Sequence, residues 1–297
     1  MNERAEHSYN PEEDKDPLLR LKDLRGDLHA HSLLSQEAGE QRQLYPLEKI
    51  AQYVADNIGA KNKAGTGIEY FAITEHTGRP LEPYRGKDEQ SGKKILEQKI
   101  LIDKLNQTER FHGLTILGGA EVNISSNGEL DIADDVLKKL DIVIASRHIQ
   151  PQEKSVAEKF SIYEKITKNP YVDILGHPEV KWWPPESGWG HEGWPKLIAL
   201  AKNYDKAIEV NVNQINSYPD EFLNLLADSN VKISFGSDTH DHPKIGQDEN
   251  LGDDWREFVR VTNRLEKAGI KKSQILNCLP LVELKQWREE RIARFEK

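Results

Sequence analysis

The sequence lacks the features that mark secreted, disulfide-linked or membrane proteins. Its 297 residues include a single cysteine, Cys278, which argues against a disulfide framework and a metal cage built from thiolates. No apolar run is long enough to span a bilayer, and residues 1–22 lack the apolar core of a signal peptide. We therefore expect a cytoplasmic protein that makes no contact with membranes.

Positive charge is also scarce. The formal net charge of -9 disfavours a broad basic surface for duplex DNA. It does not exclude a nuclease, because bound metal ions would supply positive charge locally. The length of the chain suits one α/β barrel or two smaller domains.

The sequence does contain a regular alternation of short apolar strands and helices. Strands are predicted from residue 24 to the pair His29 and His31, and then over 70–74, 114–117, 141–145, 172–175, 207–212 and 232–235. Helices are predicted from about 46 to 57 and over 92–110, 131–140, 153–168, 194–203 and 220–229, with a mostly helical tail over 254–297. This order predicts a parallel sheet with right-handed crossovers, in one domain over 24–297 that follows a flexible charged lead-in over 1–23.

The most informative stretch is Asp27-Leu28-His29-Ala30-His31. Residues two apart on a strand point to the same side, so both imidazoles would aim at one point. Neutral imidazole is the commonest protein ligand for a transition metal. The alternative is that each histidine is simply hydrogen-bonded to a neighbour.

Similar groups recur where later strands are predicted to end. They are Glu75-His76, Glu121, His148, His177 and the segment Asp238-Thr239-His240. In a β/α barrel the carboxyl ends of the strands form one rim, which carries the active site, so these side chains are expected to converge. Mixed histidine and carboxylate ligands suit Zn, Mn or Fe ions better than Mg or Ca ions.

In their order and spacing, these motifs resemble the polymerase and histidinol phosphatase (PHP) family. The matching pieces are Asp27-Leu28-His29-Ala30-His31-Ser32, Ile73-Thr74-Glu75-His76, Gly119-Ala120-Glu121, Ser146-Arg147-His148, Gly176-His177-Pro178 and Ser237-Asp238-Thr239-His240. The stretch over 172–178 resembles in particular the C-terminal PHP domain of bacterial X-family DNA polymerases, here as a stand-alone domain, since the lead-in is too short for polymerase domains. The resemblance implies a distorted, TIM-like seven-stranded (β/α) barrel whose trinuclear metal site hydrolyses phosphate esters.

The resemblance also implies a ligand set for two to three divalent metals. The first metal would take His29, His31, Glu121 and Asp238. The second would share Glu121 as a bridging carboxylate and add His148 and His177. The third would take His76, His240 and a residue of the loop after His31, where relatives place Asp or His and this chain offers Glu37.

Several residues carry predicted roles beside a structural alternative. Glu121, Asp238 and His148 are the predicted catalytic residues, although Glu121 could instead cap a helix. Arg79 and Arg147 could hold a substrate phosphate by charge-assisted hydrogen bonds, or Arg147 could face the exterior of the barrel.

Two further features have alternative readings. Asp27 is expected to hydrogen-bond a ligand imidazole or to form an ion pair at the strand edge. The loop with Trp182, Trp183, Trp189 and Trp194 could stack a base, but packing of the loop on itself is the preferred interpretation.

These predictions leave three functions to compare. The leading one is hydrolysis of a small phosphomonoester by a metal-activated hydroxide. The second is 3'-5' exonucleolytic attack on a nucleic-acid end, which the polymerase resemblance keeps open. The third, of another class, is a metal-binding interaction module without catalysis.

Overall fold

The computed structural model describes most of the chain, in eight stretches. They are residues 23–35, 45–57, 68–78, 86–111, 113–148, 155–178, 188–239 and 252–296. The predicted lead-in over 1–23 falls outside them except for Asp23, so the boundary of the domain stays a prediction.

Seven strands form one parallel sheet in which the order in space follows the order in the chain. They are β1 (Gly26–Asp27), β2 (Tyr70–His76), β3 (Thr115–Asn123), β4 (Ile142–Ser146), β5 (Ile174–Leu175), β6 (Ala207–Glu209) and β7 (Lys232–Ser234). The residues just beyond the first and last strands also meet, through a parallel bridge between Ala30 and Thr239 and a hydrogen bond of 2.8 Å from the Asp238 N–H to the His29 carbonyl. The predicted distorted seven-stranded barrel is therefore confirmed.

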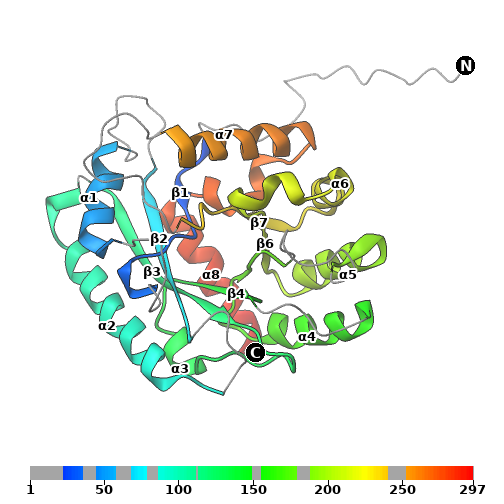
Figure 1. Cartoon of the computed structure of the whole chain (residues 1–297), viewed down its shortest axis with the longest axis horizontal. Coiled ribbons are helices and arrows are strands. Elements are labelled where there is room, and N and C mark those ends of the chain that lie inside the picture. Colours follow the sequence, from blue (N-terminus) through cyan, green and yellow to red (C-terminus); the bar gives the residue numbers. More distant parts are fainter. Residues whose placement is uncertain are drawn as a thin grey trace, which may run out of the picture.

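The helices are α1 (Leu47–Asn57), α2 (Glu89–Asn106), α3 (Asp134–Leu137), α4 (Val156–Lys168), α5 (Gly190–Asn203), α6 (Asp220–Ser229), α7 (Gly252–Lys267) and α8 (Leu281–Phe295). Helices α1 to α6 alternate with the strands and lie around the outside of the sheet, while α8 crosses behind the strands in the middle of the view (Figure 1). Short 3-10 turns are η2 (Leu33–Ser35), η3 (Glu109–Phe111), η5 (Val212–Ser217), η6 (Lys272–Gln274) and η7 (Leu276–Cys278). Within the residues described, no helix combines the length and the apolar character that crossing a bilayer requires.

The last helix closes the end of the barrel at which the strands begin. Leu284 of α8 packs with Leu28, Tyr70 and other apolar side chains of the sheet. Next to it, the fully buried carboxylate of Asp173, just before β5, pairs with Arg291 and lies 2.9 Å from the Arg288 guanidinium. Both arginines belong to α8, so this end is filled and only the opposite rim is left for a site.

The strand predictions differ from the structure mainly in three places: β1 ends at Asp27 and β6 at Glu209, both short of their predicted ends, and β3 continues beyond its predicted end. The sequence predicts that β3 ends before Gly118 and Gly119, whereas the structure continues it to Asn123. A Cβ atom on Gly119 would lie 2.7 Å from Ile142 and 2.9 Å from Thr74. The glycine is thus explained by the close approach of β2 and β4, and the longer strand places Glu121 within the sheet.

Candidate metal centre

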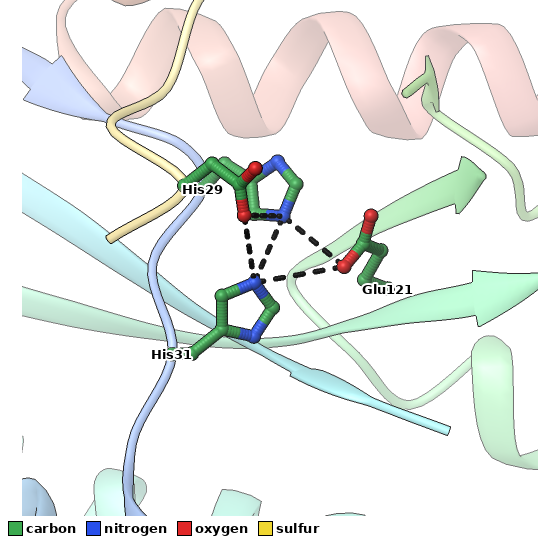
Figure 2. Close-up of side chains that lie close together, drawn as sticks. His29, His31 and Glu121 are labelled. Atoms are coloured by element: carbon green, nitrogen blue, oxygen red, sulfur yellow. Dashed lines mark hydrogen bonds and ion pairs between the residues drawn. The ribbon is translucent and has the colours of Figure 1, made fainter. Parts of the chain in front are cut away.

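Four side chains converge at the rim formed by the carboxyl ends of the strands. They are His29, His31, Glu121 and Asp238, whose candidate ligand atoms all lie within 4.8 Å of one another. Nε2 of His29 lies 3.2 Å from Nε2 of His31, and Glu121 Oε2 lies 3.4 and 3.5 Å from the same two nitrogens. Figure 2 shows these two imidazoles and the Glu121 carboxylate pointing toward one another.

A second group shares the same glutamate. His76, Glu121 and His148 bring their candidate ligand atoms within 4.8 Å of one another. Nδ1 of His76 lies 2.9 Å from Glu121 Oε2, while Nε2 of His148 lies 3.2 Å and Nε2 of His177 2.8 Å from Glu121 Oε1. Glu121 therefore lies between imidazoles on both of its oxygens, in the position that the sequence predicts for a bridging carboxylate.

The register of the sheet explains why these residues meet. His76 on β2 lies directly opposite Glu121 on β3. His148 follows two residues after Ser146, which pairs with Asn123 on β3. Residues that are distant in the chain thus meet because the carboxyl ends of the parallel strands point toward the same rim and the register aligns these positions.

Each of three histidines has a hydrogen-bond partner on the nitrogen that points away from Glu121. Nδ1 of His29 lies 2.6 Å from Glu209 Oε1, and Nδ1 of His148 lies 2.8 Å from Asn123 Oδ1. Nδ1 of His31 lies 3.3 Å from the Ser35 hydroxyl, which itself donates to Glu75. A carboxylate or amide oxygen can only accept, and the Ser35 hydroxyl uses its proton on Glu75, so Nδ1 of each ring carries a proton. Nε2 is then the nitrogen that faces the cluster and can bind a cation once it is deprotonated.

This arrangement fits a bound cation. The Nε2 lone pairs of His29 and His31 face each other, and oxygens of Glu121 and Asp238 face the same space. Oε2 of Glu121 is fully buried and lies 2.9 Å from Nδ1 of His76, but among the described residues no donor meets it in hydrogen-bonding geometry. Carboxylate oxygens and imidazole nitrogens that converge on one buried space need positive charge there, from protons on the rings or from a bound metal ion, and this donor set suits a transition metal.

The electrostatics of the cluster favour positive charge. Burial alone would raise the pKa of Glu121, but the surrounding imidazoles of His148, His29 and His76 outweigh it and hold this pKa well below its usual range. Burial would likewise lower the pKa of His177, yet the contact with Glu121 raises it to about 9. The carboxylates thus hold their charge even though they are removed from water.

The structure brings together all the predicted metal ligands that it describes. Three predicted site residues, Glu37, Arg79 and His240, lie outside the described residues, so the predicted third metal position stays a prediction. His76, assigned to that position by the resemblance, lies with Glu121 and His148. Arg147 follows β4 beside His148 and is 5% exposed.

One expectation is wrong. Asp27 was expected to bond an imidazole or form an ion pair at the strand edge, but its carboxylate accepts from the backbone N–H groups of His29 and Ser237, each at 3.1 Å, and from the Ser237 hydroxyl at 2.6 Å. The reason is that β1 lies beside the segment after β7, so the backbone N–H and the hydroxyl of Ser237 reach the Asp27 carboxylate. Asp27 therefore joins the two edges of the barrel.

The described part of the tryptophan-rich loop is packed into the protein, as the preferred interpretation of the sequence predicts. Trp189 and Trp194 are both 2% exposed, and the Trp189 indole donates to the Pro178 carbonyl at 3.0 Å. Trp182 and Trp183 lie outside the described residues. The two described tryptophans belong to the core and not to a base-stacking surface.

The sequence interpretation missed residues that hold the ligands in place. Asn123 lies two residues after Glu121, and Asn211 lies two residues after Glu209 and donates to Asp238 Oδ2 at 2.9 Å. The period of two along a strand could have found both, since it places each asparagine on the same face as the preceding glutamate.

Comparison with known proteins identifies relatives, although no family model matches the chain. A probable phosphatase from Clostridium novyi is 31% identical over 267 residues, which cover 84% of this chain and 89% of that protein. A probable phosphatase from Thermoanaerobacter sp. (strain X514) is 35% identical over 180 residues, 57% of this chain and 66% of that protein. The chain thus spans slightly less than two thirds of the second relative.

Two further matches concern a polymerase and a solved structure. The DNA polymerase/3'-5' exonuclease PolX of Bacillus subtilis is 30% identical over 226 residues, which cover 75% of this chain but 35% of PolX. The crystal structure of histidinol phosphate phosphatase from Lactococcus lactis, complexed with zinc, L-histidinol and phosphate, matches with 16% identity and a TM-score of 0.49. That match covers 83% of this chain and 94% of the phosphatase.

Proposed function

Because this chain belongs to the polymerase and histidinol phosphatase (PHP) family, we propose that it is a metal-dependent hydrolase of phosphoric ester bonds, with small phosphomonoesters as its preferred substrates. The observation that carries the proposal is Glu121, whose two carboxylate oxygens each lie next to imidazole nitrogens from different strands. One shared carboxylate between two ligand groups is the arrangement that a cluster of metals needs.

The residues divide into those that hold the cluster and those that can meet a substrate. The side chains of His29, His31 and Glu121 are 0% exposed, whereas those of His76 and His148 are 11% exposed. The side chain of Asp238 is 16% exposed. A phosphate group would therefore approach along the edge formed by His76, His148 and Asp238.

Bound divalent metals would supply a hydroxide nucleophile and positive charge on the phosphoryl oxygens. His29, His31, Glu121 and Asp238 would hold one metal, and Glu121 with His148, His76 and His177 would hold the metal or metals beside it. Burial would raise the pKa of Asp238, but the imidazoles of His29 and His31 outweigh it and keep the carboxylate ionised. An ionised Asp238 carboxylate could accept a hydrogen bond from the attacking water and orient it, while the imidazoles that keep it ionised make it a weak proton acceptor.

The preference for small substrates follows from charge. A nuclease groove that tracks several phosphates is normally lined with Lys and Arg, whereas this chain carries a net charge of -9. A single phosphate needs only one or two cationic side chains, for which Arg147 beside His148 and the predicted Arg79 are the candidates. Their role remains part of this proposal.

The experiment compares substrates on one preparation loaded with Mn²⁺ or Zn²⁺. Release of phosphate from an aryl phosphate, a sugar phosphate and histidinol phosphate is measured beside cleavage of a short single-stranded oligonucleotide. Glu121→Gln should lose about 100-fold or more of kcat/KM, since even partners that only orient metal ligands typically cost roughly 10- to 100-fold. Glu164→Gln, on the exposed face of α4, is the matched control.

The outcomes separate the candidate functions. Near-normal turnover by Glu121→Gln with unchanged metal content would overturn the assignment of the site. A higher kcat/KM on the oligonucleotide, lost in Glu121→Gln, would favour a 3'-5' exonuclease, a second candidate supported by the similarity to PolX. A metal-loaded protein that is inert on every substrate would favour an interaction module.

A further inference from the structure

The carboxylate of Asp131 is buried and belongs to neither ligand group. It is connected by hydrogen bonds to the second group, which consists of His76, Glu121 and His148. Asp131 is 5% exposed and follows the turn after β3, where an antiparallel bridge pairs Ile124 with Leu130. Burial raises its pKa, although hydrogen bonds from Thr77 and Asn123 work in the opposite direction. A buried carboxylate needs hydrogen-bond donors to compensate for its removal from water. Here the donors are Thr77 and Asn123, which also contact the residues that carry the imidazoles of His76 and His148.

The first connection runs through Asn123 to His148. Nδ2 of Asn123 donates to Asp131 Oδ2 at 2.8 Å and also to the Thr77 carbonyl. Both partners are acceptors, so the amide nitrogen must face them and the amide oxygen must face the other way. That oxygen lies 2.8 Å from Nδ1 of His148. The ring must therefore carry its proton on Nδ1, which leaves the lone pair of Nε2 toward Glu121.

The second connection runs through Thr77 to His76. The Thr77 hydroxyl donates to Asp131 Oδ1 at 2.7 Å, and the Thr77 N–H donates to the Glu121 carbonyl at 3.2 Å. Thr77 is fully buried and directly follows His76 in the chain. Asp131 thus fixes the backbone that carries His76 as well as the side chain that orients His148.

We propose that Asp131 is the positioning residue of the second ligand group, which sets the tautomer of His148 through Asn123 and the placement of His76 through Thr77. The inference rests on the proposed function, because it assumes that His76, Glu121 and His148 hold a metal. It goes further by naming one residue outside that group on which both histidines depend.

The substitution Asp131→Asn tests the proposal with almost no change in shape. Oδ1 of Asp131 accepts from the Asn123 backbone N–H at 3.0 Å, and Oδ2 accepts from Asn123 Nδ2 at 2.8 Å. An amide at position 131 must place its own NH₂ against one of these two donors. The simplest relief is rotation of the Asn123 amide, which would turn an NH₂ toward His148 Nδ1 and move the ring proton to Nε2, where a metal ligand needs its lone pair.

The measurement is competition with a chelator on the full chain loaded with Zn²⁺. Asp131→Asn should lose one class of zinc about 10- to 100-fold more readily than the wild type, the usual cost of losing a partner that orients a ligand. The zinc held by His29, His31 and Asp238 should stay. Asp141→Asn is the control, because that carboxylate also accepts a backbone hydrogen bond from β3, from the Gly118 N–H at 2.9 Å, but belongs to neither ligand group.

A second readout follows the tautomer itself. In chelated, ¹⁵N-labelled protein at alkaline pH, the His148 ring should carry its proton on Nδ1 in the wild type and in Asp141→Asn. In Asp131→Asn it should shift toward Nε2. If Asp131→Asn does not fold, Asn123→Leu removes the same acceptor and should show the same selective loss of zinc and the same change of tautomer.

The outcomes keep the inference separate from the proposed function. A wild type that retains no zinc would count against the metal site as a whole. A wild type that retains zinc, with Asp131→Asn and Asn123→Leu retaining it equally well, would overturn the positioning role alone. Equal loss of both zinc classes would also overturn it, since it would show a general loss of structure.

Discussion

Glu209 accepts from Nδ1 of His29 at 2.6 Å through one carboxylate oxygen, and from the backbone N–H of His177 at 2.8 Å through the other. It therefore touches a histidine from each side of Glu121 while lying outside both ligand groups. Glu209 is the last residue of β6, and no histidine lies next to it in the sequence. Its two contacts make it a residue that orients ligands.

We expect Glu209→Gln to weaken metal binding more than it weakens the fold. An amide can place an NH₂ against His29 Nδ1 or against the His177 N–H, and in either orientation one hydrogen bond is lost. Metal affinity should fall roughly 10- to 100-fold, as is usual for partners of ligating histidines. Elemental analysis after chelator titration checks this. Glu221→Gln, which breaks a contact with His191 on the surface, is the control. Equal retention in both variants would contradict the expectation.

Glu75 provides a second test at the other side of the site. Its buried oxygens accept from Gln98 Nε2 at 2.6 Å and from the Ser32 N–H at 3.1 Å, as well as from the hydroxyls of Ser32 and Ser35. In Glu75→Gln, the NH₂ must face either Gln98 or the Ser32 N–H, so a buried donor is left unsatisfied at a cost of about 1–3 kcal/mol.

Thermal unfolding of Glu75→Gln should therefore begin at a lower temperature, and zinc near His31 should be held more weakly because Ser35 contacts that ring. Glu97→Gln on the exposed face of α2 is the control, since Glu97 lies 3.9 Å from Lys93 in a surface pair. An unchanged melting temperature would show that Glu75 does not anchor the segment from Ser32 to Ser35.

Much of the fold could be predicted because its signals are local. Short apolar runs bounded by polar residues predicted six of the seven strands. The period of two at His29 and His31 predicted the remaining one and correctly placed both rings together, with Nε2 atoms 3.2 Å apart. The end of β3 was missed because glycine weakens strands in general, while Gly119 is required here by the closeness of the two neighbouring strands.

The partners of the ligands could not be predicted in the same way. Asp131 is connected to His148 through Asn123, and Glu75 is connected to His31 through Ser35. Such chains depend on the three-dimensional path of loops, and no spacing in the sequence reports it. Asp27 shows the same limit, since its true partner, Ser237, is 210 residues away.

A substitution at Gly236 would test how closely the segment after β7 must approach His29, a member of the first ligand group. A Cβ atom at this position would lie 2.2 Å from the His29 Cβ and 2.9 Å from the His29 backbone nitrogen. Gly236→Ala should therefore push the two edges of the barrel apart at His29, with a cost of roughly 1–3 kcal/mol from overpacking. Calorimetry should show the loss of stability, and zinc analysis should show weaker retention.

Gly92→Ala is the matched control for this substitution. Gly92 lies inside α2, and the nearest atoms to an added Cβ would be methyl groups of Val136 at 3.3 Å and of Ile132 at 3.9 Å. Alanine favours a helix interior by about 1 kcal/mol over glycine, so this variant should keep its stability and its zinc. Full zinc retention by Gly236→Ala would show that the edge can yield without moving His29.

The closed end of the barrel should control stability without controlling the site. Asp173 is fully buried, pairs with Arg291, and lies 2.9 Å from Arg288. Asp173→Ala would leave two guanidinium groups of α8 without their carboxylate, and breaking a buried pair in this way costs about 3–5 kcal/mol. The melting temperature should fall by on the order of 10 °C. Asp134→Ala, on exposed α3, should leave the melting temperature unchanged.

Below its unfolding transition, the Asp173→Ala protein should still bind zinc as tightly as the wild type, because the ligands lie at the opposite rim. Loss of zinc in the folded variant would mean that the two ends of the barrel are coupled.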